Sequence, residues 1–308
     1  MKEIAIICNP RSGSGKAFKK WKTFQTELDD SNLQYNVFFT EKSKHATALT
    51  LSALKKGANR IVSFGGDGTL NEVVQGILLS QTNVIDNVDL VVIGAGSSND
   101  FEKTFDKKSW IEKIYGHETN SIDLIKIDLR DLKGNKKTHY CINNSSIGII
   151  SEAGDRFNKA KGLTKVIKRA SVDAGAILAG IQTIIGFQSI SMCLNIDKYN
   201  KTIDSLYNIT IFKNPYVAGD MYYDQCVERD DGMLSVATIE SNSRFQLFKL
   251  IPALYAGNAL DKKGVNYFEC KSLELDTKSN LIVEADGEII GKPPVKYSVL
   301  SKKLRVVV

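Results

Sequence analysis

The first hundred residues alternate between short unbroken apolar runs and longer amphipathic segments. The apolar runs have the length of buried strands and lie at 3–8, 35–39, 60–64 and 88–93. The segments between them predict helices at 16–30, 44–57 and 69–79. In the first of these helices, Phe18, Trp21, Phe24 and Leu28 fall near helical spacing. Such alternation predicts a parallel sheet covered by helices on both faces.

After about residue 120 the pattern changes to a run of strands. The segments 121–129 and 138–147 flank a turn-rich stretch and predict a hairpin, which a mostly helical insert at 151–187 follows. Further strands are expected at 189–196, 203–212, 234–240, 267–276, 281–285, 294–299 and 303–308, with one helix at 244–256. This pattern predicts an antiparallel sandwich. We therefore expect an α/β domain at 1–130, which residues 296–308 can complete, and an all-β sandwich domain at 131–295.

Composition narrows the function classes. The chain is 43% hydrophobic and 25% charged, and its net charge of +6 is compatible with anionic ligands or an anionic membrane but too weak to indicate a nucleic-acid partner. Five scattered cysteines without a CxxC pair indicate reduced thiols and a cytoplasmic location, and three histidines without ligand spacing do not predict a zinc site. Because no stretch of about 18 uncharged apolar residues occurs, no transmembrane helix is expected.

Three glycine-rich or polar loops follow the first, third and fourth predicted strands. They read "NPRSGSGK" at 9–16, "GGDGT" at 65–69 and "GAGSSND" at 94–100. Ligands of open α/β sheets bind at this edge, glycine lets the backbone approach a phosphate, and a helix N-terminus favours an anion. We predict a phosphate-binding site, the alternative being three tight turns. Walker A and GxGxxG patterns are excluded because Pro10 and Ala17 occupy positions that need glycine and Ser or Thr, and "GGDGTLN" lacks the GxGxxG spacing.

Asp67 stands between glycines in the second of these loops. Phosphate would repel a lone carboxylate, whereas Mg²⁺ would make the carboxylate useful as a ligand, directly or through water. The alternative is a turn or N-cap residue.

The motifs together resemble a known family. "NPRSGSGK", "GGDGTLNEVVQGI" and "GAGSSNDF", followed by "SIDL" at 121–124, "RDDGML" at 229–234 and "EADGE" at 284–288, resemble the diacylglycerol kinase catalytic domain. The chain is most similar to the bacterial soluble lipid kinases of the diacylglycerol and sphingosine kinase superfamily, although NAD kinases share the GGDG element. The resemblance covers nearly the whole chain. It implies a nucleotide-binding α/β domain, a C-terminal β-sandwich and an active site between them.

The resemblance also implies ATP and Mg²⁺ as cofactors and assigns roles to individual residues. Nucleotide contacts are expected from Asn9, Pro10, Arg11, Ser12, Gly13, Thr40, Gly65, Gly66, Asp67, Gly68, Thr69, Leu70, Asn71 and Ser97. Glu288 maps to the proton acceptor for the lipid hydroxyl, with Asp286 beside it and Asp67 organising Mg²⁺. Without the other motifs, "ADGE" predicts only a hairpin turn.

A second, structural Mg²⁺ is implied in the segment "CVERDDGML" at 226–234. Asp231 is the expected ligand, with Glu228 and the backbone carbonyl of Met233 as less certain ones. The alternative is a plain turn, because Asp-Asp-Gly is also ordinary turn chemistry.

One segment departs from the family pattern. "GIISEAG" at 148–154 has Ile150 where the family often places an acid facing the lipid, and Glu152 comes two residues later. The sequence therefore predicts a lipid kinase, with diacylglycerol as the first candidate substrate. The alternatives are another hydroxyl lipid such as a sphingoid base or a polyprenol, an NAD kinase-like enzyme, or a non-catalytic lipid or nucleotide sensor.

A basic segment precedes an apolar one within the helical insert. The basic residues are Arg156, Lys159, Lys161, Lys165, Lys168 and Arg169, and the apolar segment is 170–187. Adjacent basic and apolar faces are typical of an interfacial helix on anionic lipid, so we expect peripheral membrane contact. The alternative is a solvated charged face followed by a helix packed on the sandwich. The family includes dimers, and the sequence is compatible with a homodimer.

Overall fold

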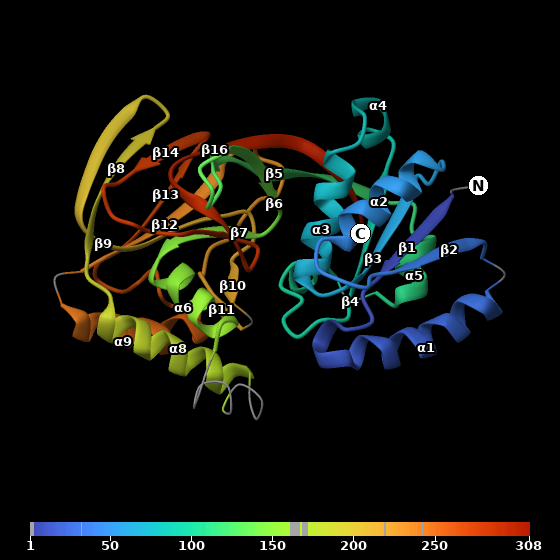
Figure 1. Ribbon diagram of the computed structural model, residues 1–308, viewed down its shortest axis with the longest axis horizontal. Coiled ribbons are helices and arrows are strands. Elements are labelled where there is room, and N and C mark those ends of the chain that lie inside the picture. Colours follow the sequence, from blue (N-terminus) through green and yellow to red (C-terminus); the bar gives the residue numbers. More distant parts are fainter. Residues whose placement is uncertain are drawn as a thin grey trace. The chain divides into compact units, whose positions relative to one another are not determined.

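The chain forms two compact units in the computed structural model, which describes residues 3–31, 33–106, 108–160, 167, 172–218, 220–241 and 243–308 (Figure 1). Unit 1 comprises Met1–Leu124, Arg229–Gly232 and Leu300–Val308. Unit 2 comprises Ile125–Glu228 and Met233–Val299. Each unit is therefore discontinuous in sequence, because two later segments of the chain belong to unit 1.

Unit 1 is built on a parallel sheet. Its strands are β1 (Ile4–Cys8), β2 (Tyr35–Phe39), β3 (Arg60–Gly65) and β4 (Asp89–Gly94), in the order β4-β3-β1-β2. The end of β16 (Glu288–Val307) adds to β4 in parallel, with Arg305 opposite Asp89. Its helices are η1 (Ser12–Gly15), α1 (Lys16–Asp30), α2 (His45–Lys55), α3 (Asp67–Leu78), α4 (Thr82–Ile85), η2 (Glu102–Thr104) and α5 (Trp110–Tyr115).

Helices cover both faces of this sheet (Figure 1). On one face, α1 buries its apolar stripe, and Phe24 stacks on Phe64 of β3 with ring centroids 5.5 Å apart. The helical spacing of Trp21, Phe24 and Leu28 puts these side chains on one stripe, and all three are buried. Helices α2 and α3 pack together and contact β1 and β3. This arrangement is the predicted α/β domain.

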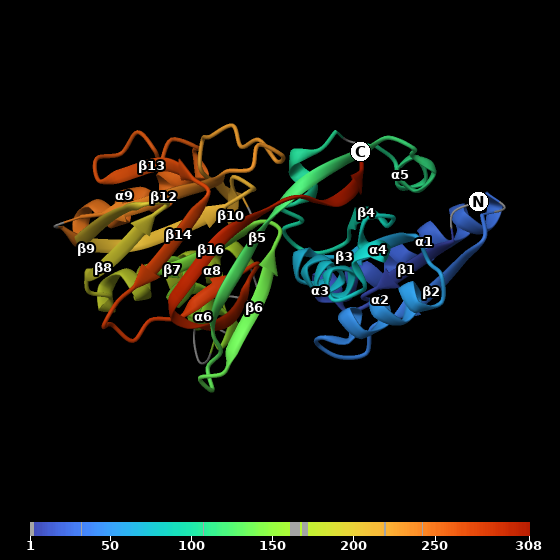
Figure 2. The ribbon, with the colours of Figure 1, turned by 90° about the horizontal axis from the view of Figure 1, so that it is seen from above.

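Unit 2 is an antiparallel β-structure (Figure 2). Its strands are β5 (Thr119–Arg130), β6 (Lys136–Cys141), β7 (Asn144–Gly148), β8 (Ile190–Ile196), β9 (Tyr199–Phe212), β10 (Tyr216–Ala218), β11 (Met221–Tyr222), β12 (Leu234–Glu240), β13 (Val265–Cys270), β14 (Ser272–Asp276), β15 (Val283–Ala285) and most of β16. The pairings β9–β7–β15–β16–β14–β8–β9 close into a ring. Strands β12 and β13 extend it from β9, and β5 and β6 extend it from β16.

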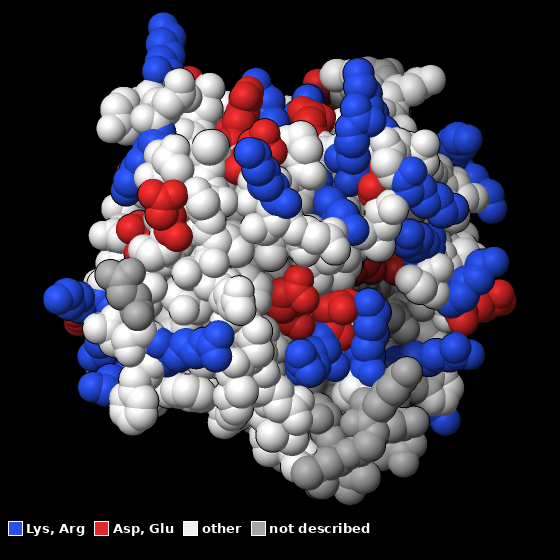
Figure 3. All heavy atoms as spheres, turned by 60° about the vertical axis from the view of Figure 1, so that its left-hand side comes forward, with Lys and Arg blue, Asp and Glu red and all other residues white. Residues whose placement is uncertain are grey.

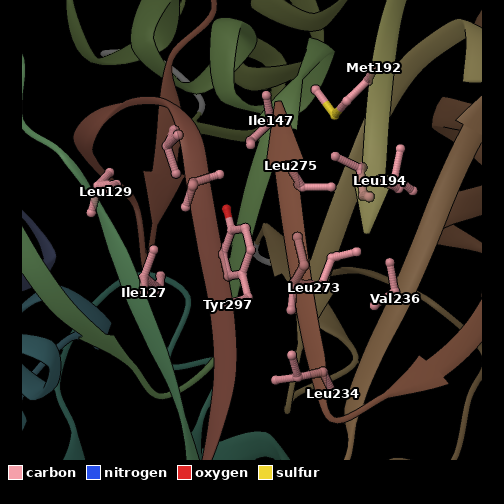
Figure 4. Close-up of a cluster of buried hydrophobic side chains, with 14 of the residues drawn as sticks. Ile127, Leu129, Ile147, Met192, Leu194, Leu234, Val236, Leu273, Leu275 and Tyr297 are labelled. Atoms are coloured by element: carbon pink, nitrogen blue, oxygen red, sulfur yellow. The ribbon is translucent and has the colours of Figure 1, made fainter. Parts of the chain in front are cut away.

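The ring encloses the core of unit 2 (Figure 4). Alternate residues of β8 and β14 point inward, namely Met192 and Leu194 on β8 and Leu273 and Leu275 on β14. The hydroxyl of buried Tyr297 lies 3.1 Å from Oγ of Ser145, so its polar end is satisfied within the core. The period-2 pattern of the sequence thus produces the predicted sandwich-like domain.

Helices α6 (Ile149–Asn158), α8 (Val172–Gly186) and α9 (Arg244–Tyr255) accompany these strands in unit 2. Helix α8 contacts both α6 and α9. In the part of the chain that the structure describes, no helix is long and apolar enough to cross a membrane.

Several predicted boundaries coincide with the structure, and others are wrong for identifiable reasons. The helix at 16–30 and the strands at 35–39 and 234–240 are confirmed as α1, β2 and β12. The predicted strand 267–276 is two strands, because Oδ1 of Asp197 accepts hydrogen bonds from the backbone N–H groups of Lys271 and Ser272 at the break. The predicted strands 294–299 and 303–308 belong to one strand, β16. The short helices α4 and α5 and the β10–β11 hairpin were not predicted.

Candidate active site

The three predicted phosphate-binding loops begin side by side in unit 1. The parallel register places Cys8 opposite Phe64 and Gly65 opposite Gly94, so the chain leaves β1, β3 and β4 at the same sheet edge. Asn9 connects two of the loops, since its side-chain Nδ2 donates to Oγ1 of Thr69 at 2.9 Å. The structure therefore brings together the glycine-rich loops that the sequence places apart.

Glycine is required where the loops touch. A Cβ atom on Gly66 would lie 3.0 Å from Cα of Gly96, and a Cβ on Gly96 would collide with Gly66. Gly13 adopts a φ of +56°, and its Cβ would lie 3.0 Å from the carbonyl oxygen of Ala95. Side chains at these positions would push the loops apart.

The other nucleotide-binding candidates surround these loops in unit 1. Thr40 follows β2, and its N–H donates to the carbonyl oxygen of Cys8 at 2.9 Å. Buried candidates are Thr40, Gly65, Thr69, Leu70 and Asn71, half-buried ones are Asn9, Pro10, Ser12, Gly13, Gly66 and Asp67, and exposed ones are Arg11, Gly68 and Ser97. The exposed and half-buried members are those placed to meet a ligand.

Asp67 is the first residue of α3, so the sequence-based helix start at Thr69 is two residues late. A carboxylate in the first turn interacts favourably with the helix dipole. Oδ1 of Asp67 also accepts a hydrogen bond from the N–H of Phe101 at 3.1 Å, which links α3 to the loop after β4. The half-buried carboxylate is thus held in one orientation at the edge where the three loops meet.

Asp67 could supply one protein ligand to a Mg²⁺ ion that is otherwise held by substrate phosphates and water. Mg²⁺ prefers oxygen donors and is commonly held by one or two carboxylates together with substrate phosphates and water. Among the described residues, no group of three or more His, Cys, Asp or Glu side chains forms a metal centre of its own. Asp67, beside the three glycine-rich loops, would suit that mode of binding.

Charged residues that the sequence analysis missed support the loop after β4. Glu102 accepts a hydrogen bond from the N–H of Gly94 at 3.1 Å, and the ammonium of Lys113 pairs with the same carboxylate. Gly65, Gly66, Asp67, Asn99, Phe101 and Glu102 line a small cavity here. In the sequence, only the position of Glu102 just after "GAGSSNDF" could have indicated a role at the site, and no sequence feature indicated a role for Lys113.

The segment Arg229–Gly232 is fixed to unit 1 by two sets of contacts. The carboxylate of Asp123, which is 1% exposed, accepts from the N–H groups of Gly232 at 2.7 Å and Lys302 at 2.8 Å. The guanidinium of Arg229 lies 4.5 Å and 4.7 Å from the ring centroids of Phe101 and Phe105, and burial lowers its pKa to about 10. The motifs "SIDL" and "RDDGML" therefore meet in space.

In unit 2, the "DGE" motif forms the turn between β15 and β16. Ala285 pairs with Glu288, and the two turn residues Asp286 and Gly287 have φ values of +47° and +86°. Positive φ at both central residues is typical of a tight hairpin turn, which Asp-Gly favours. Half-buried Glu288 is thereby placed as the first residue of β16.

Asp286 points into the protein. Its carboxylate accepts hydrogen bonds from the N–H groups of Ile142 at 3.0 Å, Asn143 at 2.9 Å and Asn144 at 3.3 Å. The buried thiol of Cys141 lies 3.1 Å from Oδ1, and burial raises the pKa of this thiol well above its ordinary value. These contacts explain why the predicted strand 138–147 is instead split into β6 and β7.

Glu284, two residues before Asp286, is a buried carboxyl group. Its side chain accepts a hydrogen bond from the N–H of Gly287. Burial raises the pKa of Glu284 from 4.5 to about 8, and the nearby negative charge of Asp286 adds to the shift. The group is therefore mostly protonated at neutral pH, beside an aspartate that accepts several donors.

This raised pKa predicts a pH-dependent stability. Because the folded-state pKa of Glu284 exceeds the unfolded value, its contribution is fully present below about pH 4.5 and is lost as pH rises through about 8. We expect Glu284→Gln to flatten the fall in Tm between about pH 5 and about pH 8. Thermal unfolding across this range tests it, with Glu274→Gln on the surface of β14 as the control. Parallel profiles for wild type and Glu284→Gln would contradict the assignment.

The segment "GIISEAG" at 148–154, which departs from the family pattern, lies at the end of β7 and the start of α6. The N–H of Ile150 donates to Oδ1 of Asn208 at 3.0 Å. Glu152, also on α6, is half-buried, and burial together with Asp155 raises its pKa. Asn158, at the end of α6, donates from Nδ2 to the carbonyl oxygen of Gly287 at 3.4 Å. Helix α6 therefore contacts the turn that carries Glu288.

The remaining candidates are placed as follows. Asp231 and Glu228 are exposed, and the backbone carbonyls of Glu228 and Met233 accept hydrogen bonds from the ammonium of Lys213 at 2.7 Å and 3.0 Å. Arg156 and Lys159 are exposed on or just after α6. The other members of the basic segment, Lys161, Lys165, Lys168 and Arg169, lie outside the described residues.

Comparison with known proteins agrees with this arrangement. Residues 3–127 match the model of the diacylglycerol kinase catalytic domain, and residues 157–308 match that of the YegS C-terminal NAD kinase beta sandwich-like domain. Residues 3–127 therefore form a diacylglycerol kinase catalytic domain. The chain is a kinase that combines this catalytic domain with a sandwich-like C-terminal domain.

Relatives and solved structures match over nearly the full length. The chain is 22% identical to the Bacillus subtilis (strain 168) protein named "Putative lipid kinase YtlR", over 98% of each chain. It is 23% identical to a diacylglycerol kinase of Staphylococcus haemolyticus (strain JCSC1435), over 98% of this chain and 86% of that protein. A diacylglycerol kinase structure from Bacillus anthracis str. Sterne has a TM-score of 0.70 at 16% identity, covering 99% and 96% of the two chains.

The fold is also shared with a kinase of a soluble dinucleotide. Yeast NADH kinase has a TM-score of 0.56 at 10% identity, covering 99% of this chain and 82% of that chain. At these identities the structural likeness establishes the fold, namely an α/β domain followed by a sandwich-like domain. The substrate has to be argued from the residues of this chain.

Proposed function

We propose that this protein transfers the γ-phosphoryl group of ATP to the hydroxyl group of diacylglycerol, giving phosphatidic acid. The observation that carries the proposal is the meeting of three glycine-rich loops with Asp67 at the N-terminus of α3, at the carboxyl edge of a parallel sheet. Backbone N–H groups and a helix N-terminus at such an edge are suited to polyphosphate. The name of the staphylococcal relative supports diacylglycerol as the acceptor.

The proposed reaction assigns separate tasks to the two units. The hydroxyl oxygen of the lipid attacks the γ-phosphorus, the bond to the β-phosphate oxygen breaks, and ADP leaves. Glu288 accepts the hydroxyl proton, because a hydroxyl with a pKa of about 15 is not ionised in advance at neutral pH. The loops of unit 1 orient the phosphates, and Asp67 and the phosphates would hold Mg²⁺, which neutralises charge on the transferring group.

We propose that Asp286 acts as a positioning residue for Glu288. Its carboxylate is engaged by three backbone N–H groups of residues 142–144, which fixes the turn that carries Glu288. A carboxylate that accepts that many backbone hydrogen bonds is fixed in position, so its task is to hold the turn. The hydrogen bond from Asn158 of α6 to Gly287 also supports this turn.

A second candidate is a kinase for another hydroxyl lipid. Ile150 offers an apolar side chain where the family often has an acid, and its backbone is fixed by Asn208. A substrate whose polar group differs from that of diacylglycerol, such as a sphingoid base or a polyprenol, would be recognised differently at this position. The reaction and the roles of Asp67 and Glu288 would be unchanged.

The substrate is tested by phosphate transfer from labelled ATP to lipids in mixed micelles with Mg²⁺. The panel contains diacylglycerol, monoacylglycerol, ceramide, a sphingoid base and a polyprenol, with NAD as the soluble acceptor. The proposal predicts the strongest transfer to diacylglycerol. Transfer to another lipid alone would support the second candidate, transfer to NAD would show a nucleotide kinase, and ATP binding without any transfer would show a sensor.

We further propose that α6, α8 and α9 meet an anionic membrane surface. Two large apolar side chains are well exposed there, Ile185 at 59% and Phe245 at 77%, and Arg244 donates to the carbonyl oxygen of Ile185 at 2.9 Å. Exposed aromatic and basic side chains on neighbouring helices suit the boundary between headgroups and acyl chains. Basic side chains are spread over the face drawn in Figure 3, in keeping with a net charge of only +6.

Membrane contact makes a direct prediction for Arg156 and Lys159. We expect Arg156→Glu/Lys159→Glu to weaken binding to vesicles containing anionic lipid by roughly 30-fold or more, most strongly at low salt, because each basic residue near such a surface contributes about 1 kcal/mol. Lys198→Glu/Lys201→Glu, which makes the same charge change at the exposed β8–β9 hairpin, is the control. Equal binding by the two double variants would contradict the proposed surface.

A further inference from the structure

A buried lysine occupies the place where family resemblance implies a structural metal ion. Lys213 directly follows β9 and is 2% exposed. Its ammonium donates to the carbonyl oxygen of Glu228 at 2.7 Å and to that of Met233 at 3.0 Å. Both residues belong to the segment in which the sequence predicts Mg²⁺, and the Met233 carbonyl is itself one of the expected ligands.

We propose that the Lys213 ammonium replaces a structural divalent cation in this protein. Backbone carbonyl oxygens are acceptors that serve either a hard cation or an ammonium. Mg²⁺ requires near-octahedral coordination by oxygens at about 2.0–2.1 Å, which an ammonium already bonded to two of those oxygens does not permit. A second cation within a few Å of the ammonium would also be repelled inside the protein.

The two carbonyls stand at the ends of one short segment. The chain leaves unit 2 after Glu228 and returns to it at Met233, while Arg229–Gly232 belongs to unit 1. Lys213 therefore binds the last residue before this excursion and the first residue after it. A divalent ion bound by the carbonyl oxygens of Glu228 and Met233 would connect the same two residues. The Lys213 ammonium can therefore take the place of such an ion.

Hydrogen bonds through Asn143 connect the backbone around Lys213 to Asp286 in the β15–β16 turn. The N–H of Lys213 donates to the carbonyl oxygen of Asn143 at 2.8 Å, and Nδ2 of Asn214 donates to Oδ1 of Asn143 at 2.7 Å. Asn143 in turn donates its N–H to Asp286. Within unit 2, a continuous set of hydrogen bonds thus connects the "DGE" turn to the ends of the 229–232 segment through Lys213.

The inference is tested by thermal unfolding with and without divalent ions, in the absence of nucleotide. In the Asp67→Ala background, which removes the catalytic metal ligand, Tm should change by less than about 1 °C between EDTA and millimolar Mg²⁺ or Ca²⁺, because a structural ion would stabilise the folded state by mass action. A rise of several degrees with either ion would overturn the proposal. This measurement does not depend on kinase activity or on its substrate.

Substitution of the lysine gives the second test. We expect Lys213→Met, which keeps an unbranched apolar stem of similar length, to lower Tm by roughly 5 °C or more and to increase hydrogen exchange in residues 223–234, since two partly buried backbone carbonyls lose their donor. Lys302→Met is the matched control, because Lys302 pairs with Asp230 of the same loop through an exposed ion pair at 3.2 Å. Equal effects of the two substitutions would contradict the role of Lys213, and if Lys213→Met does not fold, the divalent-ion measurement still decides the proposal.

Discussion

Asp67→Asn is expected to lower kcat for phosphate transfer by a factor of about 10³, the scale of a charge that acts on a transferring phosphoryl group. The amide keeps an oxygen for the N–H of Phe101, so the link between α3 and the loop after β4 remains. It removes the negative charge at the start of α3, where we propose that Mg²⁺ is held. The loss should therefore appear in activity and not in folding.

The measurement for Asp67 compares steady-state kinetics with thermal unfolding of the same preparations. Asp86→Asn changes an exposed carboxylate of unit 1 that pairs with Lys303, and it is expected to retain nearly full activity. If Asp67→Asn keeps near wild-type kcat, the carboxylate does not organise the transferring phosphate. A large drop in Tm with the loss of activity would instead assign Asp67 a structural role.

Glu288→Gln is the second substitution with a large expected effect. Removing a general base costs typically 10²–10⁴ in rate, and we expect a loss of kcat of about 10³. Glutamine keeps the shape and length of the side chain at the start of β16, so the Ala285–Glu288 pairing of the hairpin should persist. ATP binding should also persist, because all the nucleotide-binding candidates belong to unit 1.

The test of Glu288 separates binding from chemistry. ATP affinity measured by calorimetry should be unchanged, whereas single-turnover transfer to the lipid should be slow. Glu274→Gln, an exposed carboxylate on β14 that pairs with Lys296, serves as the control. Wild-type single-turnover rates for Glu288→Gln would remove Glu288 from the reaction and leave the "DGE" motif with its turn-forming role alone.

Strands β1–β4 and helices α1–α3 of unit 1 could be predicted from the sequence because their signals are local. The apolar stripe of residues 16–30 and the unbroken apolar runs of β1 and β3 each report burial within a few residues. The glycine-rich loops could be located for the same reason, since glycine marks the positions where the backbone must approach closely. The convergence of these loops follows from the parallel order of the strands.

The errors arise where a distant side chain binds the backbone. Asp286 splits the predicted strand 138–147 by capturing the N–H groups of residues 142–144, and Asp197 does the same at Lys271 and Ser272. Each aspartate lies more than seventy positions from the backbone that it binds. No local pattern can indicate such a bond.

The same limit applies to the supports of the candidate site. Arg229 stacks on Phe101 and Phe105, and Lys213 reaches Glu228 and Met233, only after the chain has folded. A single arginine or lysine near a turn carries no signal of burial in the sequence. The segment "CVERDDGML" predicted a cation, and the structure places the positive charge of a lysine beside its carbonyls.

The most direct test of the account is the fate of labelled phosphate when diacylglycerol is the only acceptor. Purified protein is incubated with Mg²⁺ and diacylglycerol in micelles, with ATP labelled at either the γ- or the α-phosphate, and the chloroform-extractable label is measured. We predict label in phosphatidic acid from γ-labelled ATP, none from α-labelled ATP, and transfer from γ-labelled ATP that is slower by about 10³ with Glu288→Gln. Extractable label from α-labelled ATP, or none from γ-labelled ATP with an enzyme that binds ATP, would contradict it.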